Sequence, residues 1–223
     1  EEIVLPKLFD ALELPVDESA ICITPLGGRH VNHFWRLLSA LDIPYVTLLD
    51  LDVARHQGGW GRIKNANDNL IKFEPTKVLP ASWPLPKWND DAAPILTHHF
   101  YEKGTASIFE ALEERNIYFS TPLDLDFAML KAYPEAYKVI PKSPTKTTIN
   151  IVLGDSHHCA DQYSKKQKEL FETYKSYFKN RSKPANHIEG IANISDENLI
   201  KNMPASYKRL GLKIKQMLEE IPE

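Results

Sequence analysis

The chain has 223 residues, of which 43% are hydrophobic, and a formal net charge of −3. This length allows one large domain or a domain with a smaller subdomain. The charge excludes a generic polycation, so any contact with nucleic acid has to come from a local basic patch. No run of about 18 apolar residues occurs, which predicts no membrane span. Cys22 and Cys159 are too few for a disulfide framework and indicate a reducing cytoplasm.

The first third of the chain alternates helix and strand. The spacing of apolar residues predicts helices over 2–13 and 31–41 and strands over 19–25 and 43–52. Short links in this order predict parallel strands joined by crossovers, whose ligands gather beyond the carboxyl ends of the strands. The helical pattern starts at the first residues with no leader before it, which favours a segment of a longer protein.

The middle of the chain is less regular. A helix is predicted over 63–73, followed by a proline-rich segment, 74–94, that contains Trp83 and Trp88. This segment reads as a loop packed on the domain, with a partner-binding surface as the alternative. A helix over 105–115 leads into a strand from 116, and the last hundred residues read mainly as helices and loops.

Two aspartates, Asp50 and Asp52, close the expected strand over 43–52. Side chains two apart on a strand point the same way, so both carboxylates can converge on one ion. Ligation by oxygen alone suits Mg²⁺ or Mn²⁺. The plain alternative is a strand that ends in solvated acids.

The residues after this pair strengthen the metal interpretation. Glycines at 58, 59 and 61 let a backbone approach a bulky substrate closely. Arg55 and Arg62 flank them and are expected to bind phosphate oxygens of DNA.

A second pair of acids, Asp124 and Asp126, follows the next predicted strand. If the two strand ends lie side by side, four carboxylates surround one cavity, enough for two divalent ions about 3.5–4 Å apart. In the alternative, Asp124 caps a helix and Asp126 is an ordinary acid of its first turn.

The third candidate is the sequence "SKPANH", in which Lys183 precedes a proline and is expected to be extended. The histidine-rich stretches "THHF" and "GDSHHCADQ" fit no zinc template. A basic stretch before Lys183 reads by default as a solvated face, but beside a metal site it becomes a surface that follows the DNA backbone. Its members are Lys165, Lys168, Lys175, Lys179 and Arg181.

The segments "PLGGRHVNHFWRLLSALDIPYVTLLDLDVARHQGGWGRI", "STPLDLDFAML" and "SKPANHI" resemble the C-terminal catalytic region of nucleases of the OLD (overcoming lysogenization defect) family. The chain looks most like class 2 members, which include Gabija-type anti-phage nucleases, over essentially its whole length. The resemblance implies an α/β fold: a Toprim-like small parallel sheet flanked by helices over 1–125, and an additional mainly helical domain over 126–223.

The resemblance also implies roles for individual residues. Asp50 and Asp52 fall on the Toprim D-x-D, and Lys183 matches a lysine near the family's active site. Asp124 and Asp126 match acids expected to bind metal.

The Toprim acidic motif E-G-x-[ST]-E is present here only as its tail. Glu1, with Glu2 as the alternative, matches its second glutamate, a metal ligand. The first glutamate is missing, which weighs against activity of this chain by itself.

The implied function is a bacterial, cytoplasmic DNA endonuclease or nickase in anti-phage defence or DNA processing, with two Mg²⁺ (or Mn²⁺) ions. Its implied partners are DNA, an N-terminal ABC-type ATPase domain of the same protein, a helicase and further copies of the chain, with no membrane. The alternatives are a Toprim transesterase, such as a topoisomerase or primase, and an inert module that docks a partner through Trp83 and Trp88.

Overall fold

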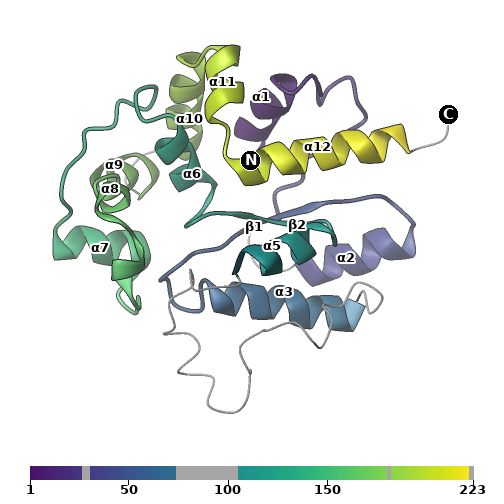
Figure 1. Cartoon of the computed structure of the whole chain (residues 1–223), viewed down its shortest axis with the longest axis horizontal. Helices are drawn as coiled ribbons and strands as arrows, with labels where there is room; N and C mark the ends of the chain where they lie inside the picture. The colour runs from purple at the N-terminus through teal and green to yellow at the C-terminus, as the bar shows by residue number, and fades with distance from the viewer. Residues whose placement is uncertain (27–30, 74–104, 180–181, 221–223) are drawn as a thin grey trace. The chain divides into compact units, whose positions relative to one another are not determined.

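A computed structural model describes residues 1–26, 31–73, 105–179 and 182–220 (Figure 1). The proline-rich segment over 74–94, with Trp83 and Trp88, and the basic residue Arg181 lie outside these ranges. None of the helices in the described ranges is long and apolar enough to cross a membrane.

The chain divides into two compact units. We call the first the helical unit, comprising 1–25, 125–152 and 163–223, and the second the strand unit, comprising 26–124 and 153–162. The expected division between 125 and 126 falls one residue after the end of a strand-unit segment, whereas residues 1–25 group with the later helices. The predicted extents of the Toprim and helical domains stay predictions.

The described part of the strand unit contains two short parallel strands, β1 (Thr47–Asp50) and β2 (Ile117–Ser120). Their register places Asp50 opposite Ser120, so the carboxyl ends of both strands meet at the same edge. β2 is buried along its whole length, as expected for a strand covered on both faces.

The helices described beside these strands are α2 (Val31–Ala40), α3 (Trp60–Phe73) and α5 (Thr105–Glu113). In Figure 1, α5 packs on β2 and α2 packs on α3. A buried hydrogen bond of 2.9 Å from Trp35 Nε1 to Thr47 Oγ1 ties α2 to the first residue of β1. The predicted helix–strand order of this region is confirmed from α2 onward.

The strand predicted over 19–25 is wrong. Residues 21–26 form neither helix nor strand, and Ile21 and Ile23 are only partly buried. An extended segment becomes a strand only when a neighbour satisfies its backbone groups, and among the described residues only β1 and β2 pair.

The helical unit contains many short helices. Its N-terminal helix is α1 (Val4–Asp10), and it contacts α10. Ser195 caps α11 by accepting a hydrogen bond from the Asn198 backbone, as its position before two acids predicts. The remaining helices are α6 (Leu125–Ala132), α7 (Lys146–Leu153), α8 (Lys165–Lys168), α9 (Phe171–Tyr174), α10 (Lys183–Ala192), α11 (Asp196–Asn202) and α12 (Ala205–Glu219).

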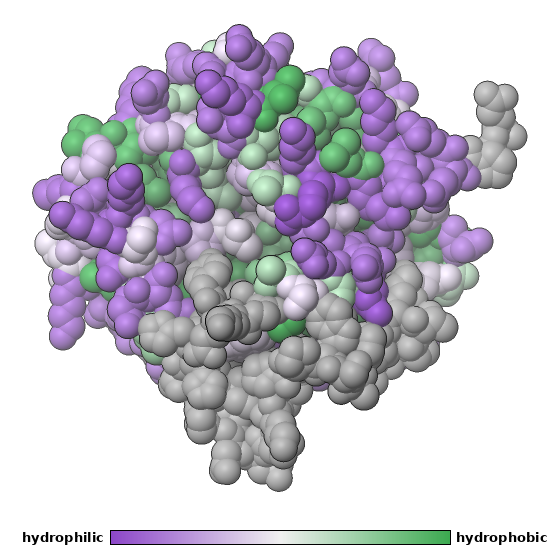
Figure 2. Space-filling view, viewed as in Figure 1, coloured by the Kyte–Doolittle hydropathy of each residue, from purple (hydrophilic) through white to green (hydrophobic). Residues whose placement is uncertain are grey.

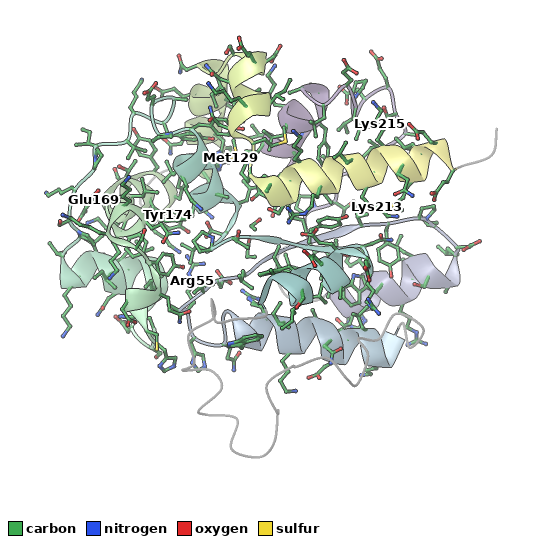
Figure 3. The ribbon with its side chains drawn as sticks, in the orientation of Figure 1. Arg55, Met129, Glu169, Tyr174, Lys213 and Lys215 are labelled. Carbon is green, nitrogen blue, oxygen red and sulfur yellow. The ribbon has the colours of Figure 1, made fainter. Side chains whose placement is uncertain are left out.

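Aromatic side chains form much of the core of the helical unit. The ring of Phe127 lies edge-on to Tyr163 and Phe171, with ring centroids 5.9 and 5.8 Å away. Met129 and Tyr174, labelled in Figure 3, are both fully buried. In Figure 2, hydrophilic side chains cover most of the described part of the visible face, with apolar ones in small groups.

The segment from Ser164 to Lys179 is not one continuous helix. Ser164 starts α8 with a capping box, α9 follows, and Lys175–Lys179 form a π-helical turn. The apolar spacing of this segment predicts which residues are buried, but it does not encode a change from i→i+4 to i→i+5 hydrogen bonds.

Candidate active site

The chain leaves β1 in a sharp turn at the candidate site. Asp52 has a φ of 54°, in the left-handed region that aspartate tolerates better than most residues. Its backbone N–H donates to the Leu123 carbonyl at 2.8 Å, which joins the ends of the two strands. β1 ends at Asp50, so Asp52 is not part of the strand. The prediction that strand alternation points the Asp50 and Asp52 carboxylates the same way is therefore wrong.

The glycine-rich loop folds back onto this turn. Gly59 donates its N–H to the Leu51 carbonyl at 2.7 Å. A Cβ at Gly58 would stand 1.8 Å from the backbone oxygen of Asp52, closer than any real contact. Close approach of backbone to backbone therefore requires glycine at 58, and the loop holds Arg55 beside the strand ends.

We expect Gly58→Ala to destabilise the protein by at least about 2 kcal/mol, because the added methyl group would have to displace the turn at Asp52. Chemical denaturation measures the loss. Gly154→Ala is the matched control: a Cβ there meets nothing within 4 Å, although the φ of 91° carries its own strain. An equal loss in both variants would contradict the tight packing at Gly58.

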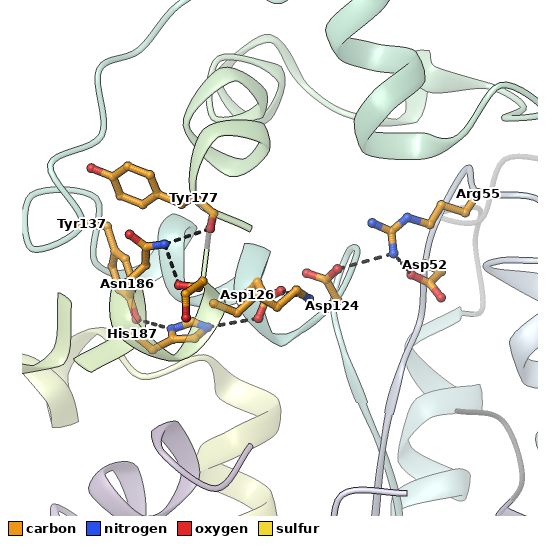
Figure 4. A network of polar contacts seen from close by, with 10 residues as sticks. Asp52, Arg55, Asp124, Asp126, Tyr137, Tyr177, Asn186 and His187 are labelled. Atoms are coloured by element: carbon orange, nitrogen blue, oxygen red, sulfur yellow. Dashed lines mark hydrogen bonds and ion pairs between the residues drawn. The ribbon is translucent and has the colours of Figure 1, made fainter. Parts of the chain in front are cut away.

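Two arginines neutralise the acids at the strand ends. Arg55 Nη1 lies 2.6 Å from Asp52 Oδ1 and 3.4 Å from Asp124 Oδ2, so one guanidinium nitrogen joins both carboxylates (Figure 4). Arg62 Nη2 pairs with the other oxygen of Asp52. Asp52 is 4% exposed and Asp124 is 6% exposed. Buried acids of this kind need a paired positive charge, and here arginine supplies it.

Arg55 and Arg62, which the sequence predicts to contact DNA, contact carboxylates in this structure. Both guanidinium groups are engaged with Asp52. Binding of a phosphate by these side chains stays a prediction and would require an exchange of partners.

The fit of a divalent cation rests on the same geometry. The described residues contain no group of three or more histidine, cysteine, aspartate or glutamate side chains that could hold a metal. Mg²⁺, however, is commonly held by one or two carboxylates, with water and substrate phosphates filling its other positions. Asp52 and Asp124 already converge on one cationic nitrogen, so this donor pair fits one such ion in place of Arg55.

The other expected metal ligands are divided between the two units. Asp50, the last residue of β1, is partly buried in the strand unit. Glu1 is exposed and belongs to the helical unit, where its carbonyl accepts the Leu5 N–H at 2.9 Å. Asp126 also belongs to the helical unit, in the first turn of α6.

Asp126 and Lys183, both predicted from the sequence, are in direct contact. Lys183 Nζ donates to Asp126 Oδ2 at 2.6 Å. The other carboxylate oxygen, Oδ1, lies 3.0 Å from His187 Nε2. In Figure 4, His187 lies between Asp126 and Tyr137. Sequence patterns did not identify His187 and Tyr137, although the SKP-x-x-H spacing places His187 one helical turn after Lys183.

Hydrogen bonding keeps Asp126 ionised despite its burial. Burial alone would raise the pKa of the Asp126 carboxyl, but hydrogen bonds from His187 and Lys183 and the positive charge of Lys183 outweigh it, and the pKa lies below its usual 3.8. The stabilisation is therefore complete above about pH 4 and is lost as the pH falls through the lowered pKa.

We expect Asp126→Asn to lower the free energy of unfolding by about 1–2 kcal/mol at neutral pH, because the Lys183 pair loses its charge. The difference from the unsubstituted protein should shrink below about pH 4, where that protein also loses its charge. Denaturation curves at several pH values measure it. Asp68→Asn, in the exposed Lys64–Asp68 pair, is the control and should change stability by less than about 0.5 kcal/mol.

The lysines of the predicted basic surface differ in their exposure and in the contacts they make. Lys165 is exposed and Lys168 is partly exposed on α8. Lys179 is exposed and lies 5.8 Å from the centroid of the Tyr174 ring.

Lys175 belongs to a polar cluster within the helical unit. It pairs with Glu172 at 2.5 Å and donates to Thr148 at 2.8 Å. The hydrogen bond from Lys175 holds the pKa of Glu172 below its usual value. DNA binding by Lys175 would have to compete with this pairing.

The strand unit is thus a small parallel sheet with acids and arginines at its carboxyl edge, as in a Toprim-like α/β fold, and the rest of the chain is mainly helical. The fold class predicted from the sequence is confirmed.

Comparisons with known proteins agree with this assignment. Residues 1–52, which include Asp50 and Asp52, match the model of the TOPRIM domain of overcoming lysogenization defect protein-like sequences. The structure is similar to the C-terminal region of the Burkholderia pseudomallei OLD protein, with a TM-score of 0.54 and 13% sequence identity, over 97% of this chain and 92% of that chain. No curated protein sequence matches the chain. The resemblance to OLD proteins is therefore confirmed by a family match over 1–52 and by the fold.

Proposed function

We propose that this chain is the catalytic part of an OLD-type DNA endonuclease that hydrolyses phosphodiester bonds with the help of Mg²⁺ or Mn²⁺. The observation that carries the proposal is the convergence of Asp52 and Asp124 on one cationic nitrogen at the carboxyl ends of two parallel strands. Ligands of parallel sheets gather at this edge. The OLD-like Toprim match over 1–52 and the likeness to an OLD C-terminal region support the same class.

Asp52 and Asp124 would hold the cation, with Asp50 as a further oxygen donor. When bound, Mg²⁺ supplies a Lewis acid that neutralises phosphate charge and favours ionisation of the attacking water. The second ion of a two-metal mechanism, with Glu1 and Asp126 among its ligands, stays a prediction.

Arg55 and Arg62 would then change partners. A cation between Asp52 and Asp124 would take over the charge compensation that Arg55 now supplies. The released guanidinium groups could bind phosphate oxygens of DNA in a bidentate manner. Lys183, whose side chain is 52% exposed, would offset the charge that builds on the phosphate during displacement.

Hydrolysis is favoured over a tyrosine-dependent transesterification. Tyr118 and Tyr133 are each 4% exposed. The hydroxyl of Tyr133 donates to the Leu199 carbonyl at 2.8 Å, and burial raises its pKa to about 12. A buried, hydrogen-bonded phenol with a raised pKa is a poor nucleophile.

The further parts of the proposal follow the family resemblance. They are an N-terminal ABC-type ATPase domain, a helicase partner, self-association and a role in bacterial anti-phage defence or DNA processing. DNA would contact the lysines of the stretch from Lys165 to Lys179.

The test is cleavage of supercoiled plasmid by the purified protein with its native flanking sequence. We expect nicked or linear plasmid with Mg²⁺ or Mn²⁺ and none with EDTA. Denaturing gels should show no protein attached to the DNA, because hydrolysis leaves no covalent adduct. Cleavage that persists in EDTA, or a covalent adduct, would overturn the proposal.

A further inference from the structure

His187 and Lys183 share one face of α10. They are four residues apart, so their side chains lie one helical turn from each other. They contact different oxygens of the same carboxylate: Lys183 Nζ reaches Asp126 Oδ2 at 2.6 Å, and His187 Nε2 lies 3.0 Å from Asp126 Oδ1. One oxygen of the Asp126 carboxylate therefore contacts His187, and the other accepts a hydrogen bond from Lys183.

Tyr137 completes the chain of contacts. Its hydroxyl lies 2.8 Å from His187 Nδ1. An ionised carboxylate only accepts, so Nε2 carries the proton toward Asp126, and in the neutral imidazole Nδ1 accepts from Tyr137. Burial raises the pKa of Tyr137, which keeps the hydroxyl protonated and able to donate.

Packing fixes the imidazole ring in this position. The ring stacks on Phe178 with centroids 4.9 Å apart and meets Tyr137 edge-on at 5.7 Å. A Cβ at Gly190, one turn further along α10, would stand 2.6 Å from the Tyr137 ring, so glycine there lets tyrosine and helix approach closely. His187 is 5% exposed and Tyr137 is 2% exposed.

Lys183 differs from the buried Asp126 and His187 because half of its side chain is exposed. A free lysine side chain samples many rotamers, and ordering it costs free energy. Asp126 orders the ammonium group, and the His187–Tyr137 pair orders Asp126.

We propose that His187 is a positioning residue: Tyr137, His187 and Asp126 form a buried relay that fixes the Lys183 ammonium for contact with the phosphate under attack. This inference rests on the proposed nuclease function. His187 acts on Lys183 through their shared partner Asp126, so its effect on catalysis is indirect.

Two substitutions separate the halves of the relay. In His187→Gln, the side-chain amide nitrogen reaches about as far as Nε2, so the bond to Asp126 is kept and the bond to Tyr137 is lost. In His187→Asn, the shorter amide reaches only as far as Nδ1, so the bond to Tyr137 is kept and the bond to Asp126 is lost. Both variants remove the stacked ring, so the loss of packing is matched.

The experiment compares plasmid cleavage by these variants with Mg²⁺ and the native flanking sequence. We expect His187→Asn to lower kcat by about 10- to 100-fold with little change in KM, as for other residues that orient a catalytic group. His187→Gln should retain most of the activity at a similar melting temperature. Equal activity of the two variants, or a loss that follows the melting temperature, would overturn the inference.

A second measurement does not depend on cleavage. Acetylation of Lys183 by a soluble acylating reagent, followed by mass spectrometry, reports how firmly the ammonium is held. We expect faster labelling in His187→Asn than in His187→Gln, while Lys64 in the strand unit labels equally in both. If the protein fails to cleave DNA but this labelling difference appears, the nuclease proposal fails and the relay stands. Equal labelling of Lys183 in both variants would overturn the relay.

Discussion

Asp52→Asn is expected to lower metal-dependent DNA cleavage by at least about 100-fold, the upper end of what is lost when a residue that only supports a metal ligand is replaced. Asn keeps the size of the side chain but removes the charge that two arginines now compensate. Plasmid nicking with Mn²⁺ measures the loss. Asp124→Asn should behave in the same way, because its carboxylate shares the Arg55 nitrogen.

The control for this prediction is Asp68→Asn, which removes a carboxylate from an exposed pair on α3 and should leave cleavage unchanged. Far-UV circular dichroism should show that each variant keeps its fold. Nicking retained by a folded Asp50→Asn, Asp52→Asn double variant would rule out the strand-end acids as the catalytic centre.

Arg55→Ala is expected to destabilise the protein by roughly 3 kcal/mol, because it leaves Asp52 and Asp124 buried with less positive charge. The value lies at the low end for buried pairs because the Arg55 side chain is 22% exposed and Arg62 still pairs with Asp52. Denaturant titration measures the loss.

Divalent cations should reverse much of this loss. A ligand that binds only the folded state stabilises it by mass action, so Mg²⁺ or Mn²⁺ should raise the melting temperature of Arg55→Ala more than that of the unsubstituted protein. Lys64→Ala, which opens an exposed pair, should cost less than about 0.5 kcal/mol and show no such rescue. A rescue of equal size in both variants would show that the cation acts elsewhere.

Sequence patterns predicted the part of the fold that depends on local periodicity. The helix at 31–40, the two strands and their parallel pairing follow from apolar spacing and short links. The first of these strands, expected to run to Asp52, ends at Asp50. The segment at 19–25 has the same strand-like pattern, but no partner for it is described. Whether a strand forms depends on long-range pairing, which local pattern does not specify.

Which residues form the candidate site was easier to predict from the sequence than how these residues contact one another. The sequence patterns predict Asp52, Arg55 and Arg62 at the site, with Asp52 as a metal ligand and the two arginines as DNA contacts. In the structure these groups pair with one another. The turn that permits this begins with a left-handed residue at Asp52, and neither strand alternation nor glycine content predicts that conformation.

His187 was missed for a different reason. A lone histidine in a helix is uninformative until its neighbours are known. Tyr137 lies 50 residues away from it and Asp126 lies 61 residues away. Only the folded chain brings these three side chains together, and Lys183 gains a defined position from them.

In the proposed mechanism, the site with the strand-end acids has two charge-balanced states. In one, seen here, Arg55 lies between Asp52 and Asp124. In the proposed other state, a divalent cation lies there and the arginine faces a phosphate. Charge compensation is kept in both states, which avoids the high cost of leaving two buried acids unpaired.

The central claim is that Asp52 and Asp124 together bind a divalent cation. The most direct measurement is the anomalous scattering of crystals soaked in Mn²⁺, with and without a DNA oligonucleotide. We expect a peak within coordination distance of both carboxylates, with Arg55 turned away from them. Crystals that keep the Arg55 bridge at high Mn²⁺ concentration, and show no peak at these two side chains, would contradict it.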